Sequence, residues 1–520
     1  MNLPRRQFLV GGTLAATLTG CGRSTREMRD DFRRLLGQPT APLLTGPFTA
    51  PTSPTLDDAS HVLNRLTFGP RPGDYARVAQ LGAKAFIEEQ LAPEKIEDTL
   101  CARVVRHEFD SLADPDSKLF PRKGQAQDSL AALFPTLKDR GARVGDLYDS
   151  DEKALLRDLT RSTILRAVLS ERQLYEVMVQ FWSDHFNIDP SKGECRWLKA
   201  ADDRDVIRAH ALGNFREMVR ASAVSPAMLW YLDGRANRRR TPQDTPNENY
   251  ARELMELHTL GVHGGYTQQD VMEVARCLTG WTCREKKKFF KGRVEFHPRD
   301  HDDGPKKVLG VNIPAGLGAA DLDRVLEIVT SHPSCANYVS WKLCRRFITD
   351  EPPAAAVEAT AKAFADSKGD IRTTLRALFA TPEFWAEETR GAKFKRPFHF
   401  VVSAVRASHA ETDASPQLVE YLQRLGHTPF RYPTPDGYPE EASHWQSTLL
   451  WRWNFAAALA ENRVKGTRLV RGELRKMAGS DETLLALLLG RKPTETEQTA
   501  FAQSGGNLAL ALASPAFQRC

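Results

Sequence analysis

Apolar residues recur along most of this chain with the three-to-four-residue spacing of amphipathic helices. The clearest stretch covers residues 155–182, where the apolar positions predict two helices that are broken near Ser170. The same spacing recurs at residues 271–278, 322–329, 354–364 and 449–459. Strand-like alternation is clearest at residues 289–296. The pattern therefore predicts a mainly α-helical, multi-helical body with at most one small β-hairpin.

Two segments repeat the same helical module without a gap. Residues 213–229 and 369–385 each begin with Gly and then Asn214 or Asp370, which are favourable helix N-caps. Each continues as one helix and stops at Ser-Pro or Thr-Pro, because proline disfavours helical backbone in the preceding residue. Residues 508–517 carry a shorter third copy. We interpret the module as a repeated structural unit.

The first 21 residues have the pattern of an export signal. Arg5 and Arg6 precede an uncharged stretch, residues 8–20, that is too short to span a bilayer and ends in small residues before Cys21. The arginine pair resembles the twin-arginine export motif, and the segment before Cys21 resembles a lipoprotein cleavage box. We predict an exported protein that is anchored to a membrane through lipidated Cys21 and faces the periplasm or the cell exterior. An ordinary cleaved signal and a cytoplasmic tether are the alternatives.

The remainder of the chain divides by composition. Residues 22–55 are charged at first and then rich in proline, which predicts an extended, poorly folded tether. Residues 56–520 form the predicted helical body, which its length allows to be subdivided near residues 310–320 and 430–460. Because no second run of 18 apolar residues follows the signal, we expect this body to be soluble and tethered.

Charge and cysteine content narrow the functional classes. The formal net charge of +6 is small for 520 residues, and we expect no nucleic-acid binding. The one basic stretch with interleaved aromatic residues, residues 284–291, is interpreted as a solvated loop. The eight cysteines form no CxxC pair, which is unlike a zinc finger or a disulfide framework. Cys277 and Cys283 either pair after export or remain buried thiols.

Residues 247–261 carry the most concentrated polar pattern of the chain. With 100° between successive helical residues, one face is shared by Asn249, Glu253 and Glu256. The core face of the same predicted helix consists of Tyr250, Leu254 and Leu257. Gly261 is suited to end this helix, and a capping-box-like pattern at residues 267–270 opens the next one.

This polar face supports two interpretations. Its carboxylates and amide are suited to bind a metal through oxygen atoms or to perform acid–base catalysis. Alternatively, the helix is solvated and gains stability from the pairs Glu248–Arg252 and Arg252–Glu256, each worth about 0.2–0.5 kcal/mol.

Histidines mark three further positions. His185 lies among aromatic residues at a predicted helix end, and His332 begins another helix. Residues 296–306 bring His297 and His301 together with three aspartates, a pattern that suits a divalent metal ion and equally a polar turn. The sequence contains no HExxH, P-loop, GxSxG or Rossmann signature, so those enzyme classes are not indicated.

Taken in order, these segments resemble a bacterial family of unknown function, DUF1800. The resemblance covers about residues 56–520 and is carried by residues 61–74, 181–186, 228–233, 247–261, 264–267, 278–281, 301–306, 332–333, 395–398 and 434–438. It implies export and a largely helical domain, and it implies no established reaction. The family pattern matches Asn247, Asn249, Arg252, Glu253, His258, His301 and Asp302. The resemblance therefore implies a shared site near Glu253, His258, His301 and Asp302.

Two functional hypotheses follow. The first is an exported hydrolase-like enzyme, assisted by a divalent metal ion in one version, that acts on an envelope or extracellular polymer. Its expected catalytic residues are Glu253, His258, His301 and Asp302, and Asn249 and Arg252 would bind substrate. In the metal-assisted version the ligands are His185, Glu253, His301 and Asp302. The second hypothesis is a non-catalytic scaffold or partner for a co-exported enzyme. The resemblance implies a partner with sulfatase- or phosphatase-like character, because such a family is a frequent genomic neighbour.

Overall fold

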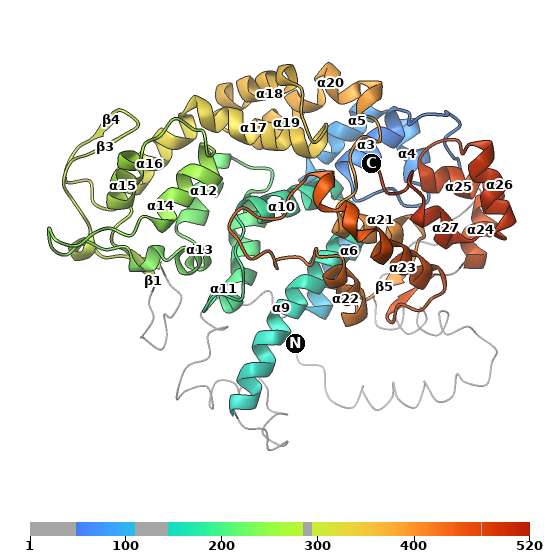
Figure 1. Cartoon of the computed structure of the whole chain (residues 1–520), viewed down its shortest axis with the longest axis horizontal. Helices are drawn as coiled ribbons and strands as arrows, with labels where there is room; N and C mark the ends of the chain where they lie inside the picture. Colours follow the sequence, from blue (N-terminus) through green and yellow to red (C-terminus); the bar gives the residue numbers. More distant parts are fainter. Residues whose placement is uncertain (1–47, 110–143, 284–293, 470) are drawn as a thin grey trace.

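The computed structural model describes residues 48–109, 144–283, 294–469 and 471–520 of the chain (Figure 1). Helices dominate this part of the chain, which confirms the predicted mainly α-helical fold. In Figure 1, helices α15 and α16 with strands β3 and β4 form one end of the molecule, and helices α24–α27 form the other. The export signal of residues 1–21 lies outside the described residues.

Short and medium-length helices are connected by tight turns. The α-helices are α3 (Asp58–Leu66), α4 (Asp74–Leu81), α5 (Ala83–Gln90), α6 (Thr99–Glu108), α9 (Val144–Leu169), α10 (Gln173–His185), α11 (Cys195–Asp202), α12 (Phe215–Ala223), α13 (Pro226–Tyr231), α14 (Asn249–Glu253), α15 (Gln268–Cys277), α16 (Ala320–Ser331), α17 (Pro333–Phe347), α18 (Ala354–Asp366), α19 (Ile371–Phe379), α20 (Pro382–Trp385), α21 (Pro397–Ala407), α22 (Pro416–Arg424), α23 (Leu449–Ala460), α24 (Arg471–Ala478), α25 (Asp481–Leu489), α26 (Glu495–Gln503) and α27 (Leu508–Ala513). Two segments have the wider π-helical turn, η5 (Asp203–Arg208) and η7 (Leu254–Thr259). The predicted break near Ser170 falls between α9 and α10 and is confirmed.

The described residues contain three antiparallel two-stranded sheets, where the sequence predicted at most one hairpin. The pairs are β1 (Trp281–Cys283) with β2 (Val294–Phe296), β3 (Lys306–Val308) with β4 (Val311–Ile313), and β5 (Glu411–Thr412) with β6 (Thr467–Arg468). Strand β2 overlaps the predicted hairpin, whose residues 289–293 lie outside the described part. The other strands have only two or three residues, too few for an alternating pattern to emerge in the sequence.

The first two copies of the repeated module pack against each other. Asn214 and Asp370 cap helices α12 and α19, as predicted. The backbone amide of Phe215 donates to the carbonyl of Gly369 at 2.8 Å, and the amide of Ile371 donates to the carbonyl of Gly213 at 2.9 Å. The two capping segments therefore form a reciprocal bridge, which confirms the structural role of the module. The third copy is helix α27, capped by Asn507.

One connected cluster of buried apolar side chains extends from Ala59 to Phe517 in the sequence. Residues 48–55, which the sequence assigned to the tether, already belong to the packed chain. The Phe48 amide donates to the Met477 carbonyl at 3.1 Å, and the Lys492 amide donates to the Ser53 carbonyl at 2.7 Å.

The structure also bears on the pairing of Cys277 with Cys283 and on the presence of membrane-spanning helices. In the described part of the chain the cysteines are free and buried, so Cys277 and Cys283 are separate thiols in this structure. Within the same residues, the search for a helix of sufficient length and hydrophobicity to cross a membrane finds none.

Buried neutral histidines make the stability of this fold sensitive to acid. Burial lowers the pKa of His61 and His258 to about 3 and holds the pKa of His185, His399 and His427 well below the usual value. In the unfolded chain these rings titrate near pH 6.5. Between these values the unfolded chain binds more protons than the folded chain, so stability is lost as the pH falls.

We therefore expect the free energy of unfolding to decrease as the pH is lowered from about 6.5 toward 3. Replacing His258 by Phe removes one of the titrating rings, and the loss between pH 7 and pH 5 should shrink by about 2 kcal/mol. Urea denaturation at several pH values measures this loss. His444→Phe, at an exposed position, is the control and should leave the pH dependence unchanged. An equal pH dependence in wild type and His258→Phe would contradict the prediction.

Candidate functional site

The polar segment at residues 249–259 is not the regular helix that the sequence predicted. It begins as α14 and widens into the π-helix η7, in which the Leu260 amide donates to the Met255 carbonyl at 2.8 Å. The Thr259 hydroxyl donates to the Leu254 carbonyl at 2.7 Å. His258 is buried on the core side with Leu254 and Met255, whereas Leu257, predicted to be core, is only half-buried.

The end of this segment is fixed by a close approach of helix α17. Gly261 has φ +81°, which confirms it as the helix stop. A Cβ atom added at Gly261 would lie 2.8 Å from the aromatic ring of Tyr338, so a larger residue would push α17 away. The predicted capping box of the next helix is also confirmed, since Thr267 and Asp270 make both of its hydrogen bonds.

Two buried histidines and a lysine lie beneath this segment. The Nε2 atom of His185 lies 3.0 Å from the carbonyl oxygen of His258, and Nζ of Lys342 lies 3.0 Å from Nδ1 of His185. Because the carbonyl can only accept, Nε2 of His185 carries the proton and Nδ1 accepts from the Lys342 ammonium group. Burial lowers the pKa of Lys342 to about 8, against the opposing effect of nearby carboxylates.

His258 is buried deeper than His185, and its ring makes no hydrogen bond within the described residues. The ring instead packs among Phe186, Tyr250 and His185, with centroid distances of 5.0, 6.2 and 6.2 Å. Its depressed pKa keeps the ring neutral at physiological pH. His258 therefore contributes its backbone carbonyl to the Lys342–His185 pair and its ring to the core.

Carboxylates without cationic partners lie on the outer side of η7. Glu253 is half-buried, and its side chain has no hydrogen bond or ion pair within the described residues. Burial raises the pKa of Glu253, and repulsion from Glu256 and Asp436 raises it further, while Arg252 opposes the shift. Arg252 is bound elsewhere, at 2.8 Å from Glu248 and 2.7 Å from Gln268.

Tyrosine side chains border these carboxylates. The Tyr266 hydroxyl lies 3.5 Å from a carboxylate oxygen of Glu256. Burial, then Asp436 and Glu256, raise the pKa of Tyr338 to about 12. Glu253, Glu256, Asp436, Tyr338 and Lys342 are called the carboxylate cluster below.

The loop that carries Asp436 is held rigidly against helix α10. Gly437 has φ +74°, and a Cβ atom there would lie 2.0 Å from the Asp184 carbonyl oxygen, so only glycine fits. The Asn187 amide donates to the Thr434 carbonyl at 2.7 Å and to the Tyr432 carbonyl at 2.9 Å. These contacts fix the position of Asp436 relative to the end of α10.

A layer of buried ion pairs supports the same loop from below. Arg396 bridges Asp184 at 2.7 Å and Glu440 at 3.3 Å. Glu440 also lies 3.6 Å from Arg346 and 4.0 Å from Lys393. Burial would raise the pKa of Glu440, but these cations outweigh it and hold the pKa at about 2. The acidic and basic groups in this layer are thus paired with one another, whereas Glu253 and Glu256 make no ion pair within the described residues.

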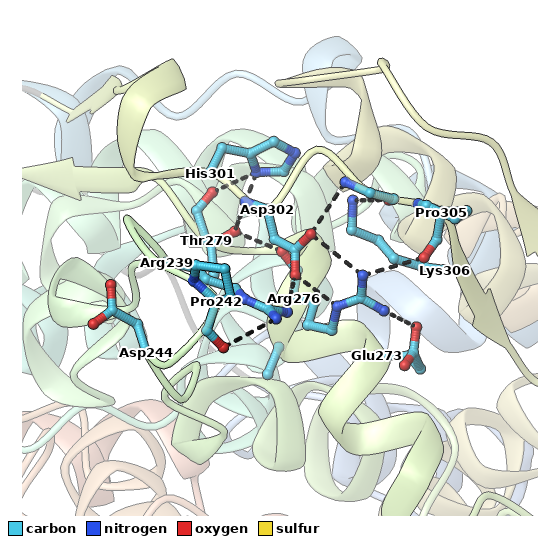
Figure 2. A network of polar contacts seen from close by, with 12 residues as sticks. Arg239, Pro242, Asp244, Glu273, Arg276, Thr279, His301, Asp302, Pro305 and Lys306 are labelled. Carbon is cyan, nitrogen blue, oxygen red and sulfur yellow. Dashed lines mark hydrogen bonds and ion pairs between the residues drawn. The ribbon is translucent and has the colours of Figure 1, made fainter.

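His301 and Asp302 belong to a different network, between α15 and the loop before β3 (Figure 2). Nδ1 of His301 lies 2.9 Å from the Thr279 carbonyl oxygen, and its Nε2 lies 3.1 Å from Asp321. Lys306 binds the same Asp321 carboxylate. His301, Asp321 and Lys306 are all buried, so the imidazole is held inside the protein.

Asp302 is paired on two sides by arginines (Figure 2). Nε of Arg276 lies 2.7 Å from one carboxylate oxygen of Asp302, and Arg239 binds the same oxygen. Burial opposes ionisation, but Arg276, the Gly304 amide and Arg239 hold the pKa of Asp302 below its usual range. The carboxylate is therefore saturated by its own neighbours.

An open hollow of about 510 Å³ lies on the surface beside this network. It is lined by Gln269, Asp270, Glu273, Arg276, Pro305, Lys306, Lys307, Gly310 and Asn312. Most of its charged groups are occupied: Asp270 caps α15, Glu273 binds Arg276, and Lys306 binds Asp321. Lys307 is exposed at its rim.

The structure therefore separates the predicted site residues into two groups. His185, Glu253 and His258 lie around η7, whereas His301 and Asp302 lie in the second network. Within the described residues, no hydrogen bond or ion pair connects the two groups. The same residues contain no group of three His, Cys, Asp or Glu side chains placed to hold a metal ion. The expected ligand set of His185, Glu253, His301 and Asp302 is thus not assembled.

The two predicted substrate-binding residues have structural partners. The Asn249 amide donates to the Leu232 carbonyl at 3.1 Å, and Arg252 is bound to Glu248 and Gln268. The pair Glu248–Arg252 therefore agrees with the interpretation of this face as a solvated helix that is stabilised by ion pairs. Glu253 and Glu256 do not form such pairs and do not agree with it.

Comparison with known proteins identifies the family. A family model described as a protein of unknown function, DUF1800, matches residues 61–519. The chain belongs to DUF1800. No curated protein and no solved structure matches the chain.

Several important residues of this DUF1800 protein were missed in the sequence. Asp184, Arg396 and Asp436 lie inside segments that carry the family resemblance, but nothing in their spacing marked them as site residues. Tyr338 and Lys342 are four residues apart on α17 and so share a helix face. That spacing alone gave no indication that the face meets η7, because the two segments lie far apart in the sequence.

The Asp302 network leads to a prediction about stability. Asp302→Asn removes the charge that compensates Arg239 and Arg276, and we expect the free energy of unfolding to fall by about 2–3 kcal/mol. Chemical denaturation measures the change. Asp303→Asn, on a side chain that is 59% exposed, is the matched control and should change stability by less than about 0.5 kcal/mol. Equal stability of the two variants would show that the Asp302 pairs contribute nothing.

Proposed function

We propose that this DUF1800 protein is an exported, lipid-anchored hydrolase that acts on an envelope or extracellular polymer through the carboxylate cluster. One observation carries the proposal: Glu253 is half-buried, has a raised pKa, and lacks a cationic partner although Arg252 is adjacent. Unpaired, mutually repelling carboxylates reduce stability, and perturbed groups of this kind concentrate at functional sites.

The cluster supplies the groups that acid–base hydrolysis requires. Glu253, with its raised pKa, is suited to exchange a proton with the bond that is cleaved. Lys342 contributes a positive charge that can stabilise a developing anion. His185 acts as a positioning residue, because its Nδ1 atom accepts from Lys342 while its Nε2–H is anchored to a backbone carbonyl.

The charge of the cluster also constrains the substrate. Glu253 and Glu256 are half-buried and Asp436 is exposed, so these three carboxylates repel an anionic polymer. We therefore propose a neutral or cationic polymer whose polar groups hydrogen-bond the carboxylates and whose apolar faces contact the tyrosine rings. His258, His301 and Asp302 take structural roles in this proposal, and no step depends on a metal ion.

Export and anchoring complete the proposal. Arg5 and Arg6 would direct the folded chain to the twin-arginine route, and lipidated Cys21 would hold it on a membrane. These residues lie outside the described part, and the proposal rests there on the sequence pattern alone.

A second candidate is a non-catalytic scaffold for a co-exported enzyme, such as the sulfatase- or phosphatase-like partner. The observation that favours it is the saturation of Asp302 and the burial of His258 and His301, which leaves these predicted reactive groups without access to a substrate. The scaffold hypothesis requires no reactivity at Glu253.

The two candidates differ in the effect of Glu253→Gln. The full chain, purified in detergent after native export, is incubated with isolated cell envelopes, and released soluble fragments are quantified. We expect Glu253→Gln to reduce release by at least about 100-fold, because a proton-transferring group is lost. Glu248→Gln, on the same helical segment but paired with Arg252, is the control and should retain activity. Unchanged release by a folded Glu253→Gln protein, or no release by wild type, favours the scaffold.

Lys342 gives the same activity a distinct pH dependence. With a pKa of about 8, the ammonium group loses its proton as the pH rises through 8, and we expect fragment release to decrease there. Lys342→Arg keeps the positive charge at higher pH, because arginine stays protonated. The alkaline decrease should therefore move upward in this variant, even if its maximal rate is lower. An unchanged alkaline limb in Lys342→Arg would remove Lys342 from the proposal.

A further inference from the structure

Helix α23 exposes a compact group of large apolar side chains. Leu449, Leu450 and Trp453 are 43%, 67% and 58% exposed. Residues three and four apart share a helix face, so these side chains protrude together. We call them the α23 patch. Trp451 lies beside it, half-buried, with the Arg424 guanidinium 4.6 Å above its ring.

The chain segment that carries the patch has little charge. Residues 442–460 contain no aspartate or glutamate, and their exposed polar residues near the patch are Ser443, His444, Gln446, Ser447 and Asn454. Arg452 is buried, and Arg424 on the neighbouring helix α22 is neutralised by its ion pair with Glu420. Tryptophan and leucine on a helix face with so little net charge suit the boundary between lipid headgroups and acyl chains.

The position of the patch relates it to the N-terminal tether. The described chain begins at Phe48, whose amide is bound to the Met477 carbonyl on α24. Helix α24 packs against α25, α25 packs against α27, and α27 packs against α23. Figure 1 shows these helices together toward one end of the molecule. The tether therefore enters the body through the same group of helices that carries the patch.

The tether is short compared with the body. Only 26 residues separate Cys21 from Phe48. Even fully extended, a chain of this length spans at most about 90 Å, which limits how far this end of the protein can lie from the anchoring membrane. A tethered surface also meets the bilayer at a high effective concentration, so even weak contacts become occupied.

We propose that the α23 patch inserts into the interface of a phospholipid bilayer as a second membrane contact beside the lipid anchor. The patch orients the body, because a single tether leaves rotation free whereas two contacts restrict it. The inference rests on the proposed anchoring at Cys21 for the nearness of the membrane, and on the exposed side chains of α23 for the contact itself.

Fluorescence from a polarity-sensitive NBD label tests the contact. The label is attached to Leu450→Cys in the full chain that also carries Cys21→Ser, and the described cysteines of the wild type are buried, which directs labelling to the new residue. Vesicles contain phosphatidylethanolamine with about 30% phosphatidylglycerol. We expect at least about a twofold rise in emission with vesicles. Val262→Cys is the control, because Val262 is an apolar residue that is 58% exposed and lies just after η7 rather than on α23. The emission of a label at this position should not change with vesicles.

A second measurement separates the patch from the anchor. The full chain with Cys21→Ser cannot be lipidated, and its sedimentation with the same vesicles reports the patch alone. Leu450→Gln combined with Trp453→Gln should weaken this binding by at least about tenfold. If the anchoring proposal fails, wild type and Cys21→Ser bind vesicles equally, and the label at residue 450 still reports insertion.

Three results would overturn the inference. One is a label at residue 450 that does not respond to vesicles. Another is unchanged sedimentation of the double Gln variant. The third is a label that responds only when a second envelope protein is added, because the patch would then be a protein-binding surface.

Discussion

The contact of the segment around η7 with helices α10 and α17 is the constraint on which the arrangement of the polar groups depends. His258 follows the buried Leu254 and Met255 on the core face, and its carbonyl oxygen lies 3.0 Å from Nε2 of His185. Glu253 and Glu256 are only half-buried. The Lys342–His185 pair and the carboxylate cluster therefore both form where this segment meets the two helices.

Compensation of charge distinguishes the cluster from the rest of the polar interior. Asp302 is held by two arginines, and Glu440 is surrounded by Arg396, Arg346 and Lys393. In these networks the pKa of Asp302 and of Glu440 is lowered. Glu253 has the opposite environment, with burial and like charges that raise its pKa. A half-buried carboxylate that repels its neighbours reduces stability, and function can explain why it is kept.

The sequence carried more information about the fold than about the site. Helical spacing, the caps at Asn214 and Asp370, the stop at Gly261 and the break near Ser170 are local features, and each was predictable. The grouping of side chains was not, because it depends on contacts between distant segments. His301 and Asp302 appeared equivalent to Glu253 and His258 in sequence, yet they are saturated by Arg239, Arg276, Thr279 and Asp321. Lys342 and Asp436 became visible only where α17 and the loop at residues 434–440 meet η7.

The ionisation of Glu253 is the most direct test of this account. Infrared difference spectra between wild type and Glu253→Gln, recorded as a function of pH, isolate the titration of this carboxyl group. We predict that Glu253 titrates with a midpoint above the usual glutamate value of about 4.3. The corresponding difference spectra for Glu248→Gln should give a midpoint below that value, because Arg252 binds Glu248. A Glu253 midpoint at or below that of Glu248 would contradict the account, since it would mean that a cation already compensates the carboxylate.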